Sequence, residues 1–325
     1  MTTKQYVFVV AIFVLSVLAS FYSGYFLKDL LIKANVGTDT SQSNLKPYFS
    51  DEIILISKNK PHYTLIAYSS RSSKKNLLFS QTQRVFFFDG NRWQKKFFNT
   101  DSKESEIAKT PIIPSWNIEV DPTLVLKERV GGEIQIDSNK IGFDVPEIDN
   151  ELGIRSQEDY TIFRSEATGK LIVNGKEYES YVLYSRTYSY SVSIDLVRIT
   201  DPLGINTDWV AFWDNEGNFY NVDKTSVDDN YKGVYKSHSI AVLKDNLGRV
   251  QKSFSLAIKK KSTTGYIVDI TDGINRSIDV NILNSTDKNE VSSPYIWATG
   301  QVEGEVVANN GKRIKGFGIY EQLYQ

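Results

Sequence analysis

The sequence predicts an all-β protein in which two antiparallel β-barrel or sandwich units follow one N-terminal transmembrane helix. Three observations lead to this prediction. An apolar run without charge occupies residues 6–27, and short alternating segments bounded by turn residues fill the chain beyond Pro47. No stretch after residue 34 keeps a helical apolar period over about three turns.

The N-terminal apolar run is long enough to cross a membrane. It extends from Tyr6 to Leu27, and at about 1.5 Å per residue it spans a hydrocarbon core of about 30 Å. The alternative is a cleaved signal peptide, whose apolar region is usually about 7–15 residues long and ends in small residues. Here the run ends in the bulky segment Phe21–Phe26, which favours a retained anchor. We expect a single-pass membrane protein whose bulk is extracytoplasmic, although lysines flank both ends of the span and leave its orientation open.

Four regions follow from the distribution of residue types. Residues 1–34 form the anchor with a short flank, and residues 35–46 form a flexible linker because they are small, polar and without periodicity. The remaining chain is long enough for two domains. We place the first β domain at residues 47–195 and the second at residues 196–325.

Turn signals divide the chain beyond the linker into short strands. Residues tolerant of positive φ stand in the pairs and triplets Asp89-Gly90, Asn174-Gly175, Asn215-Glu216-Gly217, Asn246-Leu247-Gly248, Asp272-Gly273 and Asn310-Gly311. The strands that they separate are predicted at 53–57, 63–68, 83–88, 170–173, 209–213, 253–258 and 265–270. Segments 101–122 and 147–157 are predicted to be loops. Hairpin turns at this density indicate antiparallel structure.

Composition excludes several classes of function. The chain has no cysteine, which excludes disulfides, thiolate metal sites and cysteine nucleophiles. Its net charge of -1 offers no basic face for nucleic acid. The two histidines, His62 and His238, lack metal-ligand spacing, and we interpret each as structural or surface. We expect no metal and no cofactor, and the sequence identifies no catalytic residue.

Aromatic residues on the predicted strands are the best candidates for a binding site. Ordinary core packing is the alternative interpretation. If the rings instead line a barrel cavity, the ligand is a hydrophobic or amphipathic small molecule. The candidate ligand-binding residues are Trp93, Tyr184, Tyr188, Trp209, Trp213 and Trp297.

The C-terminal half resembles the hydroxyneurosporene synthase (carotenoid hydratase-like) family of two-domain lipocalin-like proteins. Residues 295–304 read YIWATGQVEG and are followed by Gly311 and by IKGFGIYE at 314–321, which is similar to the closing hairpin of that family. Residues 206–217, NTDWVAFWDNEG, are similar to its aromatic strand and acidic turn. The resemblance covers residues 165–325 and implies two lipocalin-like domains that bind an apolar ligand of the lipid or isoprenoid class.

One departure from the family bears on catalysis. The family places an Asp-His stretch associated with activity upstream of the aromatic strand, whereas residues 179–188 read ESYVLYSRTY here. We therefore expect binding of a hydrophobic small molecule without catalysis. Two alternatives stay open: a hydratase- or isomerase-like enzyme that uses a carboxylate such as Asp208 or Glu321, and a surface module that binds a protein partner.

Overall fold

The computed structural model describes residues 48–73, 78–103, 130–145, 152, 154–156, 160–189, 205–227, 237–286, 289–292 and 295–324. The predicted anchor, the predicted linker and most of the predicted loop at 101–122 lie outside these residues. No helix in the described part of the chain is long and apolar enough to span a membrane.

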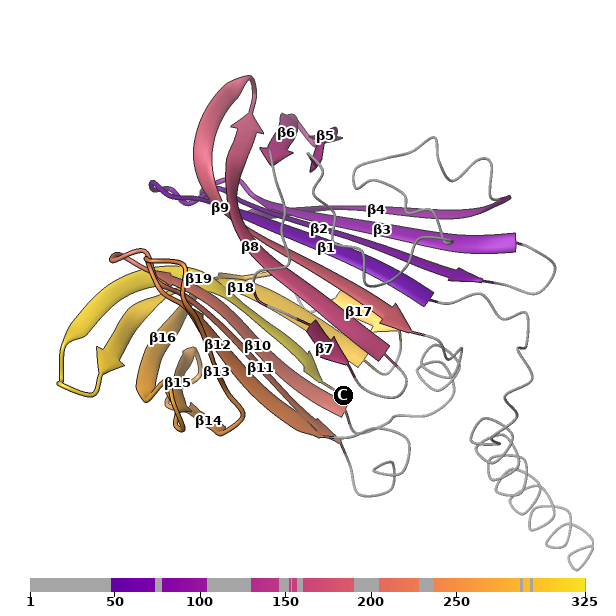
Figure 1. Ribbon diagram of the computed structural model, residues 1–325. Coiled ribbons are helices and arrows are strands. Elements are labelled where there is room, and N and C mark those ends of the chain that lie inside the picture. The colour runs from indigo at the N-terminus through magenta and orange to yellow at the C-terminus, as the bar shows by residue number, and fades with distance from the viewer. Residues whose placement is uncertain are drawn as a thin grey trace, which may run out of the picture. The chain divides into compact units, whose positions relative to one another are not determined.

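The first sheet contains nine antiparallel strands in the order β4-β3-β2-β1-β9-β8-β6-β5, and β7 pairs with β8 (Figure 1). Its first strand pairs with its last, β1 with β9, so that the middle of the sheet joins segments far apart in the sequence. The strands are β1 (Tyr48–Ser57), β2 (Thr64–Ser73), β3 (Leu78–Phe88), β4 (Trp93–Lys103), β5 (Val130–Ile136), β6 (Asn139–Val145), β7 (Ile154–Ser156), β8 (Tyr160–Val173) and β9 (Lys176–Ser189).

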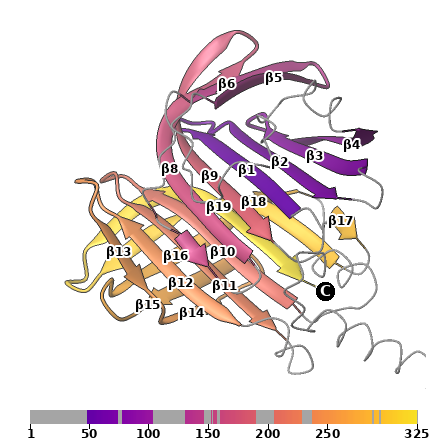
Figure 2. The ribbon, with the colours of Figure 1, turned by 45° about the vertical axis from the view of Figure 1, so that its right-hand side comes forward.

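The second sheet contains ten strands in the order β13-β12-β11-β10-β19-β18-β16-β15-β14, and β17 pairs with β18 (Figure 2). Here too the first strand, β10, pairs with the last, β19. The strands are β10 (Ile205–Asp214), β11 (Phe219–Val227), β12 (His238–Lys244), β13 (Val250–Ser253), β14 (Leu256–Lys260), β15 (Gly265–Ile270), β16 (Arg276–Ser285), β17 (Asn289–Ser292), β18 (Tyr295–Ala308) and β19 (Arg313–Tyr324).

The predicted fold class is confirmed for the described residues, which form two nearly closed, barrel-like sheets without a helix. All six predicted turns contain a glycine with positive φ, from +80° to +93°. Three local predictions are wrong. The loop predicted at 101–122 overlaps the end of β4, which continues to Lys103. The strand predicted at 253–258 is broken after Ser253, because the Ser253 hydroxyl donates a hydrogen bond to the carbonyl of Ser255. The loop predicted at 147–157 contains β7. It also contains Leu152, which is 3 % exposed and packs in an apolar cluster.

Alternation along the central strands assigns side chains to three hydrophobic clusters. In β1, Ile53 and Leu55 belong to the core of the first sheet, whereas Ile54 and Ile56 belong to a third cluster that contains residues of both sheets. In β10, Val210 and Phe212 belong to the core of the second sheet. Successive side chains of a strand point to opposite faces, so each sheet has a concave core face and an outer face packed against the other sheet. We call the third cluster the inter-sheet cluster.

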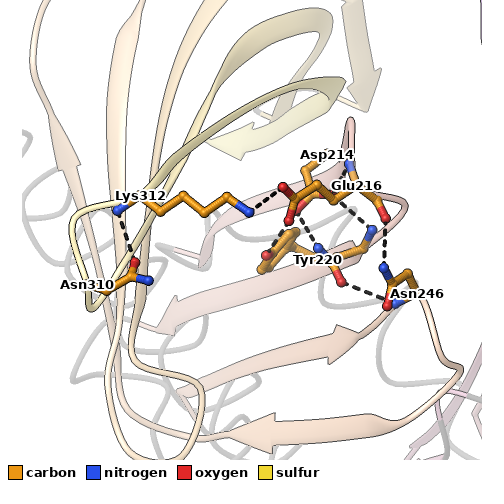
Figure 3. A network of polar contacts seen from close by, with 7 residues as sticks. Asp214, Glu216, Tyr220, Asn246, Asn310 and Lys312 are labelled. Carbon is orange, nitrogen blue, oxygen red and sulfur yellow. Dashed lines mark hydrogen bonds and ion pairs between the residues drawn. The ribbon is translucent and has the colours of Figure 1, made fainter.

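One end of the second sheet is held by a polar network that joins three hairpin turns (Figure 3). The buried carboxylate of Asp214 accepts hydrogen bonds from the backbone of Glu216 and Asn218, from the Asn218 amide and from the Tyr220 hydroxyl. Asn246 donates to the Glu216 carbonyl, and Lys312 pairs with the Glu216 carboxylate. Burial, followed by the Asp214 charge, raises the pKa of Tyr220, so this phenol stays protonated and serves as a donor.

Replacing Asp214 with alanine is expected to lower the free energy of unfolding by about 2–3 kcal/mol, because buried donors, including the Tyr220 hydroxyl, lose their acceptor. Asn310→Ala is the matched control, since this exposed side chain accepts one bond, from the Lys312 amide, and should cost about 0.5 kcal/mol. Urea unfolding of both variants measures the difference. Equal losses would show that the Asp214 network is not what holds these turns.

Candidate functional site between the two sheets

Polar side chains form a row across the outer face of the first sheet. The register of β3, β2, β1, β9 and β8 places Arg84, Tyr68, Glu52, Ser185 and Arg164 directly opposite one another in turn. Residues opposite each other in antiparallel strands share a face. Glu52 precedes Ile54 of the inter-sheet cluster by two positions, so the row belongs to the face that packs against the second sheet.

A matching row crosses the second sheet. The register of β11, β10, β19 and β18 aligns Asp223, Trp209, Glu321 and Thr299. Trp209 is a member of the inter-sheet cluster, which places this row on the face toward the first sheet. Together with His238, which contacts Asp223, the two rows define what we call the polar layer: Glu52, Tyr68, Arg84, Arg164, Ser185, Trp209, Asp223, His238, Thr299 and Glu321.

An ion pair joins the two rows. Nη2 of Arg164 lies 2.9 Å from Oδ2 of Asp223, and Nε2 of His238 lies 3.1 Å from Oδ1 of the same carboxylate. The side chains of Arg164, Asp223 and His238 are only 16 %, 5 % and 14 % exposed. Buried charges are retained in proteins when they are paired, so the Arg164–Asp223 contact is what permits both charges between the sheets.

Trp209 forms the floor beneath the Arg164 guanidinium. The guanidinium carbon lies 5.8 Å from the centre of the Trp209 ring, within the range of a cation–π contact. The indole N–H donates to Oδ1 of the buried Asn221 at 2.7 Å, which fixes the orientation of the ring. Asn221 and Trp209 therefore position the arginine that pairs with Asp223.

Further inter-sheet contacts flank the polar layer. Glu166 accepts a hydrogen bond from Lys244 at 3.0 Å and from the Trp213 indole at 3.3 Å. Toward the other side of the sheets, the Gln301 amide donates to Oγ1 of Thr64 at 2.6 Å, and the Trp93 indole donates to Asn284 at 2.8 Å. These contacts join the two sheets beside the buried charges.

Glu52 is a carboxyl group of the polar layer whose pKa lies near neutral pH. Burial raises its pKa to about 7, and the nearby Arg164 guanidinium opposes that rise. A carboxyl group that titrates near neutral pH can both donate and accept a proton under physiological conditions. Such a shift is typical of functional sites.

Glu52 makes the folding stability depend on pH. Its pKa is raised in the folded state from the usual 4.5, so the folded protein holds one more proton than the unfolded chain between about pH 4.5 and 7. The contribution of Glu52 to the free energy of unfolding is therefore fully present below pH 4.5. It is lost as the pH rises toward 7, with a slope of at most about 1.4 kcal/mol per pH unit. Urea unfolding from pH 5 to 8 should show this decline in the wild type and a flatter profile in Glu52→Gln. Parallel profiles would contradict the assignment.

The structure separates the predicted ligand-binding residues. Trp209 and Trp213 are buried in the inter-sheet cluster, and Trp93 packs against it. Tyr184 lies on the opposite face of the first sheet, in the core of that sheet. Tyr188 belongs to β9 and Trp297 to β18, but their side chains lie outside the described residues. Only the three tryptophans at 93, 209 and 213, among the described candidates, are brought into one cluster.

The two predicted carboxylates lie on opposite faces of the second sheet. Glu321 belongs to the polar layer, opposite Trp209. Asp208 alternates with Trp209 and lies toward the core of the second sheet, where it accepts hydrogen bonds from the Tyr320 hydroxyl at 2.5 Å and from the Gln322 amide at 3.2 Å. Burial and the Asp208 charge raise the pKa of Tyr320, which keeps this phenol protonated as the donor.

The two histidines differ in their surroundings. His62 stacks on Phe317, with ring centroids 4.0 Å apart, and its Nδ1 donates to the Ser57 carbonyl at 2.9 Å. These contacts give His62 a structural role. His238 instead contacts a buried carboxylate in the polar layer, a role that the sequence did not indicate. No group of three or more His, Asp or Glu side chains among the described residues is arranged to hold a metal ion.

The fold and this site define a lipocalin-like two-sheet protein. No protein-family model matches the sequence, and no curated protein matches it significantly. Among solved structures, the chain is similar to a protein from Nitrosomonas europaea assigned as AttH, with a TM-score of 0.52 and 11 % identity over 86 % of this chain and 92 % of that one. It is also similar to CghA, solved with Sch210972, with a TM-score of 0.51 and 10 % identity over 86 % and 88 % of the two chains.

A third similar structure is kievitone hydratase from Nectria haematococca, with a TM-score of 0.47 and 12 % identity over 89 % of this chain and 92 % of that one. At 11 % and 10 % identity, the similarity to the Nitrosomonas europaea protein and to CghA extends to the fold alone. The sequence resemblance to the carotenoid hydratase-like family therefore agrees with the observed fold.

Proposed function

We propose that this protein binds an amphipathic small molecule of the lipid or isoprenoid class, with its polar end at the polar layer between the two sheets. The observation that carries the proposal is the buried Arg164–Asp223–His238 cluster, set beside apolar residues of both sheets. Buried charges stabilise folding poorly compared with apolar packing of the same volume, so their presence favours a functional role. A polar cluster adjoining apolar side chains suits a ligand with one polar end.

The membrane anchor belongs to the same proposal. We propose that the apolar run at residues 6–27 tethers the protein to a bilayer and leaves both sheets on the extracytoplasmic side. A tethered binding protein would meet sparingly soluble ligands at the membrane where they partition.

Solvent extraction of the purified full-length chain tests the proposed function. The chain is purified in a detergent that is easily told from lipids by mass, extracted with organic solvent, and the extract is identified by mass spectrometry. We expect one amphipathic compound in stoichiometric amount, strongly depleted in Arg164→Met purified in parallel. An extract with only bulk membrane lipids, in equal amount from both proteins, would contradict the proposal.

A second function, catalysis of proton transfer on the bound ligand, is favoured by Glu52. With a pKa of about 7, its carboxylic acid can protonate a carbon–carbon double bond of a ligand. The resulting cation then returns a neighbouring proton to the Glu52 carboxylate, which is isomerisation, or adds water and passes the surplus proton of that water to the same carboxylate, which is hydration. Glu52→Gln should abolish turnover of the extracted compound while it keeps binding that compound. Turnover retained by the variant would exclude this role for Glu52.

A further inference from the structure

One ring nitrogen of His238 contacts a carboxylate of the polar layer, and the other is buried. His238 is the first residue of β12, and its Nε2 lies 3.1 Å from Oδ1 of Asp223. Its Nδ1 is buried and has no hydrogen-bond partner among the residues that the structure describes. Buried polar atoms nearly always have a partner in folded proteins, so such an atom calls for an explanation.

The neighbours of His238 determine which ring nitrogen carries the proton. Asp223 is ion-paired with Arg164, and an ionised carboxylate can only accept hydrogen bonds. Nε2 must therefore be the protonated nitrogen that donates to Asp223. In the neutral ring Nδ1 is then left with a lone pair, and it acts as an acceptor.

A second buried atom in the polar layer also lacks a partner. Oγ1 of Thr299, a residue that is 1 % exposed, makes no hydrogen bond within the described part of the chain. Thr299 belongs to the row that contains Trp209 and Asp223, on the face toward the first sheet. His238 and Thr299 share a sheet face, but β11, β10 and β19 lie between their strands, so one polar group can complete the hydrogen bonding of only one of the two atoms.

We infer that the ligand carries a hydroxyl group, and that this hydroxyl donates a hydrogen bond to Nδ1 of His238. The inference rests on the proposed function and names the chemical class of the ligand. A carbonyl, ether or carboxylate oxygen at this position would repel Nδ1, because both atoms carry lone pairs. An alcohol has an O–H group that can donate a hydrogen bond to Nδ1. His238 is therefore a specificity-determining residue that favours the alcohol over its ether or ester.

The protonation of the ring can be measured without a ligand. The full-length protein, labelled with ¹⁵N in its two histidines, is examined by NMR at pH 8, where an unperturbed imidazole is neutral. His238 is expected to carry its proton on Nε2, and His62 on Nδ1, because His62 donates from Nδ1 to the Ser57 carbonyl. The two residues serve as internal references for each other, and His62→Gln assigns the signals. A proton on Nδ1 of His238 would overturn the inference and leave the proposed function standing.

Binding of two matched probes tests the ligand class. Retinol has an apolar chain with a terminal hydroxyl, and retinyl methyl ether differs only in lacking the O–H donor; both are followed by fluorescence. Wild-type protein is expected to bind retinol about 3- to 10-fold more tightly than the ether, as one hydrogen bond allows. His238→Lys keeps a donor for Asp223 but has no hydrogen-bond acceptor in place of Nδ1, because an ammonium group can only donate. In this variant the preference for retinol should disappear.

Each outcome of the probe experiment decides a different point. Equal binding of both probes to the wild type overturns the inference and leaves the proposed function intact. This measurement uses the wild-type protein alone, so it does not depend on whether a variant folds. A preference for retinol that persists in His238→Lys, with unchanged unfolding, assigns the selectivity to another group and overturns the role of His238. Failure of both probes to bind the wild type contradicts the proposed function, and the inference fails with it.

Discussion

Gly318→Ala is expected to destabilise the protein by about 3 kcal/mol or more, among the largest effects of any single substitution. A Cβ atom at this position would lie 2.0 Å from the Ala211 carbonyl oxygen and 2.8 Å from the Cα of Phe212. Both are backbone atoms of β10, which pairs with β19 at this point. The clash can be relieved only by separating β10 from β19, the first and last strands of the second sheet. Urea unfolding followed by tryptophan fluorescence measures the loss.

Gly142→Ala provides the matched control in a strand of the first sheet. The nearest atoms to a Cβ there lie at 3.5 Å, an ordinary van der Waals distance, and the position does not require a positive φ. We expect a change within about 1 kcal/mol, because alanine also reduces the entropy of the unfolded chain. Equal effects at Gly142 and Gly318 would contradict the close approach of β10 and β19.

Arg164→Met should have the second large effect, a loss of about 3 kcal/mol of folding free energy. The substitution keeps an unbranched apolar stem but removes the guanidinium that pairs with Asp223, whose side chain is 5 % exposed. It also removes the positive charge near Glu52, so the pKa of that carboxyl group should rise further above its present value of about 7. Urea unfolding at pH 7 measures the first effect, and the pH profile measures the second.

Lys170→Met in the same strand is the control for Arg164→Met. Lys170 pairs with Glu177, but both side chains are more than half exposed, and the pair is expected to contribute at most about 0.5 kcal/mol. The double variant Arg164→Met with Asp223→Leu should recover much of the stability lost in the single variant, because the buried Asp223 carboxylate is removed together with the Arg164 guanidinium. If the single Arg164 variant is no less stable than the Lys170 variant, the ion pair is not buried in solution.

The sequence was sufficient to predict the class of fold because its signals are local. Turn pairs such as Asn174-Gly175 and Asp272-Gly273 determine where a hairpin reverses, and each is found at a turn with positive φ. The break after Ser253 was not predictable, since the apolar pattern continues across it and the interruption depends on contacts with Thr271, far along the chain. Leu152 was missed for a similar reason: an isolated leucine in an acidic segment shows no periodicity.

The candidate site depends on long-range pairing, and the sequence revealed only parts of it. Trp209 and Trp213 were selected as aromatic residues on a strand, and the structure places both between the sheets. Glu52, Arg164 and Asp223 were not selected, because a charged residue in a strand is usually solvated. Their contact follows from the pairing of β1 with β9 and from the packing of two sheets, and no local pattern predicts either. The only local signal of the site was the charge of residues such as Glu52, which alternates along its strand with the core residues Ile53 and Leu55.

The central claim, that a ligand binds at the polar layer, is tested most directly by photo-crosslinking. A long-chain fatty alcohol with a diazirine near its hydroxyl end is bound to the full-length protein and irradiated, and the labelled residues are identified by mass spectrometry. Because neighbouring residues of a strand face opposite ways, the labelled positions tell the two faces apart. We expect labels at Glu52, Asp223 or Glu321, suppressed by excess retinol. Labels confined to core-facing residues of one sheet, such as Tyr184 or Tyr320, would contradict the claim and place the ligand inside a barrel.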